Sequence, residues 1–377
     1  MSSNLPVVAF NAHLASGAAS YRSAGISGYI GKLLSHLPLT KDLRYAIFLN
    51  NASLAAELSQ PVYTSRWNTS HPLTRIWWEQ AILPLELRRR HAQLLHAPAF
   101  VGPLLSACPQ VVTVHDLSFL RHPEFFRRGN RGYLRWMTRL TCRRAAAVIA
   151  VSHFTAQEVT RLLSVPAARV HTIYHGVDPR FRPLPAEEVT RFRQQKGLPE
   201  RFILYLGTLE PRKNLLSLVR ACALLDEPQT QLFLAGGRGW LYAEIFAEVE
   251  RLGLQDRVHF PGYIPDKELV LWYNAAWVFA YVSLYEGFGL PILEALACGL
   301  PVLAGNTTSL PEAAGNGALL VSPTAPAEIA AGLRRLWHEK PLREQLRHAG
   351  LAHAARFTWE QTGKYTAALY RRLIAAT

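Results

Sequence analysis

Cysteine is scarce in this sequence, with four residues among 377. The four lie far apart and form no CxxC pair, so the sequence predicts neither a zinc site nor a disulfide framework. No apolar run approaches the roughly 18 residues that a membrane span requires. The first residues, MSSNLPVVAF, lack the basic region of a signal peptide, and we expect a protein of the reducing cytoplasm.

Acidic residues are scarce in the first half alone. Residues 1–180 contain 20 Lys and Arg against 8 Asp and Glu, whereas residues 181–377 contain 21 against 19. The first half therefore carries a net charge of +12 and the second half +2. Such asymmetry indicates an anionic partner, which could be nucleic acid, an anionic membrane surface or a phosphorylated substrate.

The order of apolar segments predicts an α/β fold. Hydrophobic residues make up 49% of the chain, and its length suits two domains. Apolar runs of about five residues alternate with helical patterns in both halves, as βαβ units on parallel sheets do. Prolines interrupt this alternation, and we place a linker at residues 181–200. We expect two doubly wound domains that bind ligand at the carboxyl ends of their strands, in the cleft between them.

The most informative segment runs from Glu286 to Glu294, with the sequence EGFGLPILE. It follows an apolar strand and begins a helix, so Gly287 and Gly289 allow a ligand close to the backbone N–H groups, an arrangement that suits a phosphate. Glu294, about one turn into the helix, could accept two adjacent ribose hydroxyls, and Glu286 could accept sugar hydroxyls. A glycine-rich turn with a capping glutamate is the alternative that spacing leaves open.

This segment, continued as EGFGLPILEALACGLPVLAG, resembles the E-x7-E signature of retaining glycosyltransferases of the family 4 group. Further similar elements occur in the expected order: Gly25-Ile-Ser-Gly28-Tyr29, Arg75-Ile-Trp-Trp-Glu-Gln80, His115-Asp116, Val151-Ser152, His175-Gly-Val-Asp178 and Gly207 through Arg212-Lys213-Asn214. The resemblance covers nearly the whole chain and implies the GT-B fold, in which two Rossmann-like domains face each other across a cleft. It implies an acceptor-side domain at 1–180, a nucleotide-sugar-binding domain at 201–356, and a helix at 357–377 that crosses back to the first domain.

The resemblance assigns most donor contacts to the second domain. Two cations beside a helix start suit a pyrophosphate by charge alone, although a solvated turn would have the same sequence. In the family the lysine at the position of Lys213 binds the donor diphosphate, and Arg212 lies beside it. Many members carry an arginine directly after the glycine that corresponds to Gly207, where this chain has Thr208. The resemblance implies further donor contacts from Gly287, Phe288, Gly289 and Leu290, from Glu294 at the ribose, and from Tyr263 at the nucleobase.

The first domain supplies four more candidates. Gly25 and Gly28 begin a predicted helix and could present N–H groups to the diphosphate, although an ordinary strand–helix connection looks the same. His115 ends a predicted strand; a lone histidine is more often structural, but the resemblance implies contact with the donor sugar. It implies an acceptor-side or orienting role for Asp116.

A run of arginines could explain the charge asymmetry. Residues 127–144 contain seven arginines and no acid. Four of them, Arg128, Arg131, Arg135 and Arg139, share one face of a predicted helix. We interpret this face as a docking surface for an anionic membrane or a phosphorylated lipid carrier, with a solvated face and a dimer contact as the alternatives.

These observations together predict a metal-independent, retaining hexosyltransferase. It would move a hexose from a nucleotide diphosphate sugar to a glycan or lipid-linked acceptor, at the inner face of the membrane or free in the cytoplasm. GDP-mannose is the favoured donor, because the sequence resembles bacterial mannosyltransferases of polysaccharide assembly. A nucleotide-sugar epimerase of the same architecture is one alternative. A basic nucleic-acid-binding protein is another, but the sequence has no recognisable nucleic-acid module, and we expect no nucleic-acid partner.

Overall fold

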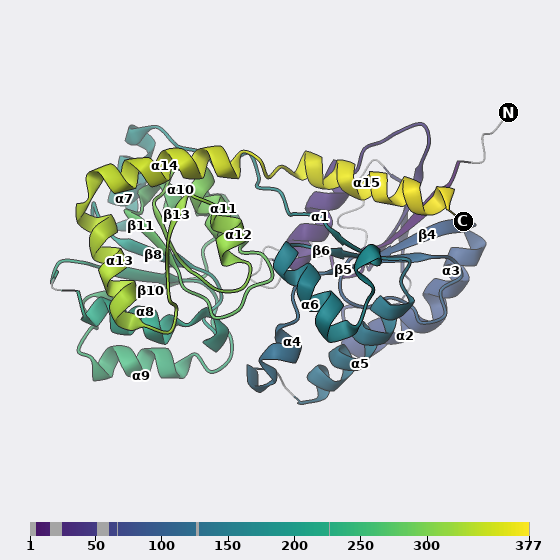
Figure 1. Ribbon diagram of the computed structural model, residues 1–377, viewed down its shortest axis with the longest axis horizontal. Coiled ribbons are helices and arrows are strands. Elements are labelled where there is room, and N and C mark those ends of the chain that lie inside the picture. The colour runs from purple at the N-terminus through teal and green to yellow at the C-terminus, as the bar shows by residue number, and fades with distance from the viewer. Residues whose placement is uncertain are drawn as a thin grey trace. The chain divides into compact units, whose positions relative to one another are not determined.

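The computed structural model describes residues 5–15, 25–50, 60–65, 67–125, 128–225 and 227–376. The chain divides into two compact units, residues 1–176 with 359–377 and residues 177–358 (Figure 1). Each unit contains one sheet, and the strand pairs of both sheets are parallel. Among the residues that the structure describes, no helix combines the length and the apolar composition that a membrane span needs.

The first unit has a seven-stranded sheet in the order β3-β2-β1-β4-β5-β6-β7. Its strands are β1 Val7–Asn11, β2 Arg44–Leu49, β3 Val62–Thr64, β4 Ala92–Ala97, β5 Gln110–Val114, β6 Ala147–Ala150 and β7 Val170–Thr172. Its helices are α1 Ile26–His36, α2 Pro72–Trp77, the π-helix η3 Trp78–Ile82, α3 Leu83–Arg89, α4 Ser118–Arg121, η4 Pro123–Phe125, α5 Arg128–Arg144, α6 His153–Leu163, η5 Ala167–Arg169 and α15 Trp359–Ala375.

Alternation along β1 explains the two layers of helices on this sheet. Val8 and Phe10 belong to one apolar cluster, with side chains from α1 and α15. Ala9 belongs to a second cluster with Trp78 and Leu83, on the other face. Successive strand residues point to opposite faces, so an unbroken apolar strand needs helices on both sides.

The C-terminal helix α15 is part of the first unit. It packs against α1 so closely that a Cβ on Gly363 would lie 2.1 Å from the backbone oxygen of His36. A buried polar chain also ties α15 to the sheet: His96 contacts the Tyr370 hydroxyl at 2.5 Å and the Thr113 hydroxyl at 2.8 Å. A polar chain of this kind fixes the helix in one orientation, because each buried polar group requires its partner.

The second unit has a six-stranded sheet in the order β10-β9-β8-β11-β12-β13. Its strands are β8 Ile203–Leu206, β9 Leu232–Ala235, β10 Val258–Gly262, β11 Val278–Tyr281, β12 Val302–Gly305 and β13 Ala318–Val321. Its helices are α7 Ala186–Lys196, η6 Pro211–Lys213, α8 Leu215–Ala223, α9 Ala243–Arg251, η7 Asp266–Glu268, α10 Leu269–Ala275, α11 Leu290–Ala297, α12 Leu310–Ala314, α13 Pro326–His338 and α14 Lys340–Ala354.

The strand order reverses once in each sheet. In the first sheet the chain winds outward from β1 to β3 and then in the opposite direction from β4, whereas in the second the reversal lies between β8 and β11. The loops that leave such a pair of strands diverge, and ligands of doubly wound sheets bind at this point. Each reversal is therefore an expected ligand-binding position.

The stretch expected to be a linker, residues 181–200, is part of the second unit. It contains α7, which buries Val189 and Phe192. Arg193 of this helix donates to the backbone oxygen of Ala275 at 2.7 Å. The prolines of this stretch precede and follow the helix, where they are compatible with helical structure, rather than interrupting it.

Candidate functional site

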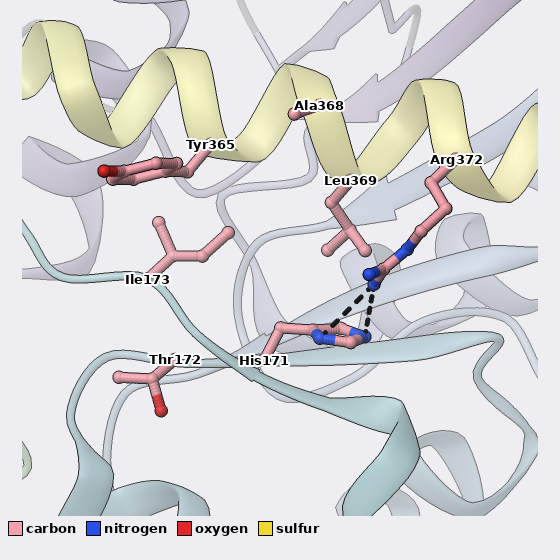
Figure 2. Close-up of a pocket in the computed structure, with 7 residues that line it drawn as sticks. All are labelled: His171, Thr172, Ile173, Tyr365, Ala368, Leu369 and Arg372. Carbon is pink, nitrogen blue, oxygen red and sulfur yellow. Dashed lines mark hydrogen bonds between the residues drawn. The ribbon is translucent and has the colours of Figure 1, made fainter.

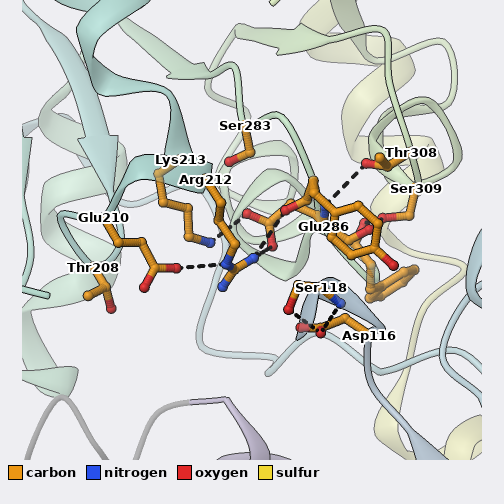
Figure 3. A network of polar contacts seen from close by, with 12 residues as sticks. Asp116, Ser118, Thr208, Glu210, Arg212, Lys213, Ser283, Glu286, Thr308 and Ser309 are labelled. Carbon is orange, nitrogen blue, oxygen red and sulfur yellow. Dashed lines mark hydrogen bonds and ion pairs between the residues drawn. The ribbon is translucent and has the colours of Figure 1, made fainter. Parts of the chain in front are cut away.

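A buried ion-pair network lies at the carboxyl ends of β8 and β11, where the second sheet reverses (Figure 3). Lys213 Nζ donates to Glu286 Oε1 at 2.5 Å and to the Tyr281 hydroxyl at 2.8 Å, and this hydroxyl donates to the same carboxylate at 2.9 Å. Arg212 Nη1 donates to Glu286 Oε2 at 2.9 Å, and its Nε pairs with Glu210 Oε1 at 2.7 Å. The structure thus brings three predicted residues together: Arg212, Lys213 and Glu286.

Backbone geometry after β8 places the two cations. Gly207 follows the strand in close contact with the next loop, because a Cβ on Gly236 would lie 1.8 Å from the Gly207 oxygen. Asn214, with a φ of 59°, follows the short helix η6 and precedes α8. Its amide donates to the backbone oxygens of Val282 at 3.0 Å and Pro323 at 2.6 Å, so this turn is bonded to the loop that follows β11.

The charge of Glu286 is stabilised by its neighbours. Burial alone would raise the pKa of this carboxyl, but the charges of Lys213 and Arg212 outweigh burial and lower the pKa to about 2. Glu286 is therefore ionised at neutral pH. One guanidinium group, of Arg212, and one ammonium group, of Lys213, face the two carboxylates of Glu210 and Glu286. The network is therefore formally neutral.

The turn between β11 and α11 contains the predicted segment Gly287, Phe288, Gly289 and Leu290. Gly289 has a φ of 107°, which disfavours residues with a side chain, and it precedes the first residue of α11. Ser309 Oγ donates to the backbone oxygens of Glu286 and Phe288, both at 2.9 Å. This hydroxyl holds the turn in place at the carboxyl end of β11, where α11 begins with Leu290 and Pro291 and the Ile292 N–H donates to the Gly289 oxygen at 2.9 Å.

Glu294 occupies a second polar environment, on α11. It accepts a hydrogen bond from the Tyr273 hydroxyl at 2.9 Å. Burial raises the pKa of Glu294 to about 7, although the Tyr273 hydrogen bond and the charge of Arg180 lower it. Arg180 itself is paired with Asp266. Near neutral pH the Glu294 carboxyl is therefore partly protonated and partly ionised.

Tyr263 lies just after β10 and is 40% exposed. It lines a cavity of about 280 Å³ together with Phe233, Ile264 and Trp272. An ion pair of 2.9 Å between Lys196 and Glu268 belongs to the same cavity. The predicted base contact thus lines a recess of mixed polar and apolar character and is not part of the ion-pair network around Glu286.

His115 lies in the first unit, directly after β5. Its Nε2 lies 2.8 Å from the backbone oxygen of Pro98, which requires the proton on this nitrogen. Its ring packs edge-on against Tyr29 at 4.7 Å, and His175 lies 5.5 Å away. Burial lowers the pKa of His115 to about 4, so the imidazole is neutral and can offer Nδ1 as an acceptor.

The other candidates of the first unit surround the starts of two helices. Asp116 Oδ1 accepts from the backbone N–H of Ser118 at 2.9 Å and from its hydroxyl at 2.6 Å, which ties Asp116 to the first residue of α4. Gly25, with a φ of 71°, precedes α1, and both Gly25 and Gly28 are exposed.

The arginine-rich stretch forms α5. Arg135 and Arg139 are exposed, one helical turn apart, and Trp136 between them is 64% exposed. The side chains of Arg128 and Arg131 lie outside the described part of the structure, as does Arg127 altogether. The described half of the face therefore combines cations with an exposed aromatic ring.

A cavity of about 380 Å³ lies between β7 and α15 (Figure 2). Its lining includes His171, Thr172, Tyr365 and Arg372, whose guanidinium Nη2 lies 3.0 Å from His171 Nε2. Its lining residues are different from the predicted site residues. We assign this cavity no functional role.

Four residues of the second unit's site received no role from the sequence. Tyr281 and Tyr273 lie in a strand and a helix, where aromatic residues are usually part of the core, and Glu210 and Asn214 lie in a turn. The signal that could have found the last two is their place in the segment Gly207–Asn214, next to the predicted cations. In the described ranges, no three His, Cys, Asp or Glu side chains converge closely enough to hold a metal ion.

Comparison with known families covers most of the chain. Residues 44–181 match the family described as Glycosyltransferase Family 4, and residues 187–353 match the family described as Glycosyl transferases group 1. O-antigen chain mannosyltransferase B of Escherichia coli is 34% identical over 331 residues, which cover 86% of this chain and 84% of that protein. Serotype-specific mannosyltransferase WbdA of Escherichia coli is 30% identical over 241 residues, 62% of this chain, but these cover only 30% of that longer protein.

Solved structures share the fold. Anabaena HepE in complex with UDP-glucose superposes with a TM-score of 0.76 at 21% identity, covering 97% of this chain and 99% of the other. The two Rossmann-like parallel sheets and this similarity confirm the predicted GT-B fold class. The predicted resemblance to bacterial mannosyltransferases of polysaccharide assembly is confirmed by the relatives just described.

Proposed function

The chain belongs to the glycosyltransferases of family 4 and group 1, and from this premise we propose that it is a retaining mannosyltransferase that uses a nucleoside diphosphate sugar. The acceptor is a hydroxyl of a glycan, free or linked to a lipid. The relative named O-antigen chain mannosyltransferase B supports both the sugar and the class of acceptor, and the serotype-specific mannosyltransferase WbdA supports the sugar.

The observation that carries this proposal is the pairing of Lys213 and Arg212 with one carboxylate at the strand reversal of the second sheet. A departing nucleoside diphosphate gains negative charge, and preorganised cations stabilise that charge where it develops. Lys213 has three N–H donors and Arg212 has five, so both can bind phosphate oxygens while Glu286 still orients them. Backbone N–H groups at the start of α11 add a favourable dipole.

Two carboxylates and an aromatic ring supply three further contacts with the donor. Glu294 accepts the ribose hydroxyls, Glu286 accepts hydroxyls of the transferred sugar, and Tyr263 contacts the base. Gly207 and the segment Gly287, Phe288, Gly289 and Leu290 bring backbone close to the diphosphate.

The first unit supplies four further residues. Gly25 and Gly28 contribute N–H groups, and His115 contacts the donor sugar. Asp116 acts as an acceptor-side or orienting group through its place beside α4.

Positioning and electrostatics account for the reaction without an enzyme nucleophile. The bond between the anomeric carbon and the diphosphate oxygen breaks, and the acceptor oxygen bonds to the same face of that carbon. The acceptor proton passes to the departing phosphate oxygen. Holding the acceptor against the anomeric carbon converts a bimolecular step into a local one, which lowers the barrier by avoiding most of its entropic cost. No metal ion enters this proposal.

GDP-mannose is the donor that we propose first, because the relatives are named mannosyltransferases, while the UDP-glucose of HepE represents the main competing donor. The test is a thermal-shift panel of GDP, UDP, ADP and dTDP with their sugars. A ligand at 100 times its Kd stabilises a protein by about 2.7 kcal/mol. We expect the largest shift with GDP and GDP-mannose. A larger shift with UDP-glucose would change the donor, and no shift with any nucleotide would refute the proposal.

We further propose that α5 contacts anionic membrane, where a lipid-linked acceptor would be presented. Exposed Arg135 and Arg139 with Trp136 between them support this, since basic residues near an anionic surface and an interfacial aromatic ring both favour peripheral binding.

A further inference from the structure

The strand reversal of the first sheet, between β1 and β4, holds a polar cluster that the donor site does not use. Asn11 ends β1, and His13 follows two residues later. Trp78 and Glu79 reach them from the π-helix η3, and both are buried. Asn11 and His13 thus lie at the carboxyl end of β1, beside the strand reversal, a place where doubly wound folds bind ligands.

Hydrogen bonds and stacking define the geometry of the cluster. Asn11 Nδ2 donates to Glu79 Oε1 at 3.1 Å, and the backbone N–H of His13 donates to Asn11 Oδ1 at 3.3 Å. The imidazole of His13 stacks on Trp78 with ring centroids 3.7 Å apart. Backbone and ring contacts thus hold His13 in place without using its ring nitrogens.

Both ring nitrogens of His13 lack a hydrogen-bond partner among the described residues, although the residue is only 2% exposed. Buried polar atoms are nearly always paired, because an unpaired one loses its bonds to water and gains nothing. The one described partner of the 6% exposed Glu79 carboxylate is the Asn11 amide. The cluster therefore has hydrogen-bonding capacity that the described residues do not satisfy.

The π-helix is a second sign of function. π-helical turns are rare within α-helices and are frequently found at functional sites. Here it turns two successive side chains, Trp78 and Glu79, inward toward the end of β1. The same segment, Arg75-Ile-Trp-Trp-Glu-Gln80, contributes Arg75, whose charge acts on both His13 and Glu79.

The protonation states favour an uncharged ligand. Burial lowers the pKa of His13 to about 3, with the Arg75 charge adding to the effect, so the imidazole is neutral. Burial raises the pKa of Glu79 to about 7, opposed by Arg75 and the Asn11 hydrogen bond. A neutral imidazole offers one donor and one acceptor, and the carboxyl group adds further acceptors. A hydroxyl both donates and accepts, whereas a phosphate requires several donors and positive charge.

We infer that His13 and Glu79 bind hydroxyls of the acceptor saccharide and fix its orientation for transfer. The inference rests on the proposed function, since it takes the ligand to be the sugar that receives the mannosyl group. His13 contributes a donor and an acceptor, Glu79 accepts, and Asn11 orients Glu79. Trp78 supports the imidazole by stacking.

The kinetic test separates acceptor binding from donor chemistry. Release of nucleoside diphosphate from GDP-mannose is measured with water alone and with methyl α-D-mannopyranoside as acceptor, for His13→Gln and Glu79→Gln. We expect release into water to change less than about twofold, and the KM for the mannoside to rise about tenfold, the effect of losing one hydrogen bond to a neutral group. Glu248→Gln is the matched control, because Glu248 is a similarly buried helical glutamate in the second unit.

Two kinetic outcomes would overturn the inference. Unchanged acceptor KM in both variants would exclude contact with the acceptor, and an equal loss of release into water and of transfer would indicate a structural role. If the wild-type protein neither binds nor cleaves any nucleotide sugar, the proposed function itself fails. This wild-type measurement therefore distinguishes failure of the proposed function from failure of the inference.

A spectroscopic test needs no turnover. Side-chain ¹H–¹⁵N spectra of the histidines, with His13 identified by the His13→Gln variant, are recorded with methyl α-D-mannopyranoside and with inorganic phosphate. We expect the His13 nitrogens to shift with the mannoside and not with phosphate. A shift with phosphate alone would make this an anion site, and no shift with either would mean that the ring nitrogens bind only water.

Discussion

Lys213 and Glu286 lie 73 positions apart in the sequence, yet the ammonium group and the carboxylate are 2.5 Å apart in the structure. Their loops leave adjacent parallel strands, β8 and β11, so both arrive at the same edge of the sheet. Because the pair is buried, removing one member leaves the other as an uncompensated charge. The ligand affinity and the local stability of this edge are therefore linked.

Lys213→Ala is expected to weaken nucleoside diphosphate binding by roughly 1.5–3 kcal/mol, the contribution of a hydrogen bond to a charged group. Isothermal calorimetry with GDP measures the change. Lys340→Ala, which removes a lysine that is 77% exposed in the same unit, is the control and should leave affinity unchanged. Equal affinity of Lys213→Ala and wild type, with both folded, would move the diphosphate site elsewhere.

Glu286→Gln is expected to act in a different way. It removes the carboxylate that holds Lys213 and Arg212, so both cations become more available to phosphate and affinity for free GDP should not fall. Sugar transfer should fall by about tenfold or more, since one charged hydrogen bond to the sugar is lost. GDP affinity is measured by calorimetry, and kcat/KM is measured for sugar transfer, for both Glu286→Gln and wild type. A parallel loss of both would mean that Glu286 serves the nucleotide rather than the sugar.

The sequence was sufficient to predict both sheets because their strands are short apolar runs that end in glycine or polar residues. The apolar run at 44–49 forms β2, for example, and the helical pattern at 326–338 forms α13. The edge strand β3 was missed, since its three residues are only partly buried or exposed and carry little apolar signal. Helix α7 was missed because the prolines around it dominated the pattern.

Part of the candidate site could not be predicted from sequence. Glycines and cations after strands identify the loops, which is why Lys213 and Glu286 were named. The partners of these residues come from positions where the same residue type is usually structural. Tyr281 lies in a fully buried strand, and only the fold shows that its hydroxyl reaches Glu286. The same holds for His13 and Glu79, which lie 66 positions apart in the chain and meet only through the β1 end and η3.

The raised pKa of Glu294 predicts pH-dependent nucleotide binding. The carboxylate form accepts ribose hydroxyls, so GDP affinity should fall as the pH is lowered through about 7, by up to about tenfold between pH 8 and pH 6. Glu294→Gln should remove this dependence, and inorganic pyrophosphate, which lacks a ribose, should show the same pH profile with both proteins. Identical GDP profiles for wild type and variant would exclude Glu294 from the ribose.

The same group affects stability with the opposite sign. Its pKa is raised by folding, so its contribution to the free energy of unfolding is fully present below about 4.5 and is lost as the pH rises through about 7. Ligand-free Glu294→Gln should therefore lose less thermal stability than wild type between these two pH values.

Contact between α15 and α1 makes a prediction about stability. A methyl group on Gly363 would lie 2.1 Å from the His36 backbone oxygen, so Gly363→Ala must push the two helices apart. We expect a loss of about 1–3 kcal/mol, as for other overpacked sites. Gly31→Ala, inside α1 with open space around its Cβ, should instead stabilise by about 0.5–1 kcal/mol. Thermal midpoints that move in the same direction would contradict this packing.

The basic face of α5 leads to a prediction about membrane binding. At about 1 kcal/mol per cation, Arg128, Arg131, Arg135 and Arg139 could contribute about 4 kcal/mol at low salt, enough for reversible docking but not for insertion. Raising the salt should abolish this binding, because the Debye length falls from about 10 Å at 0.1 M to about 3 Å at 1 M. Co-sedimentation with anionic and neutral vesicles compares wild type with the variant in which these four arginines are glutamine.

A control of equal charge makes this experiment decisive. Replacing four exposed arginines of the second unit by glutamine removes the same net charge: Arg334, Arg335, Arg347 and Arg356. If net charge alone drives adsorption, both fourfold variants will lose it equally, and α5 is then an ordinary solvated face. If α5 is the docking surface, the control will bind anionic vesicles nearly as well as wild type while the α5 variant will not. Only this second outcome supports an acceptor presented at a membrane, because it ties binding to one helix that also exposes Trp136.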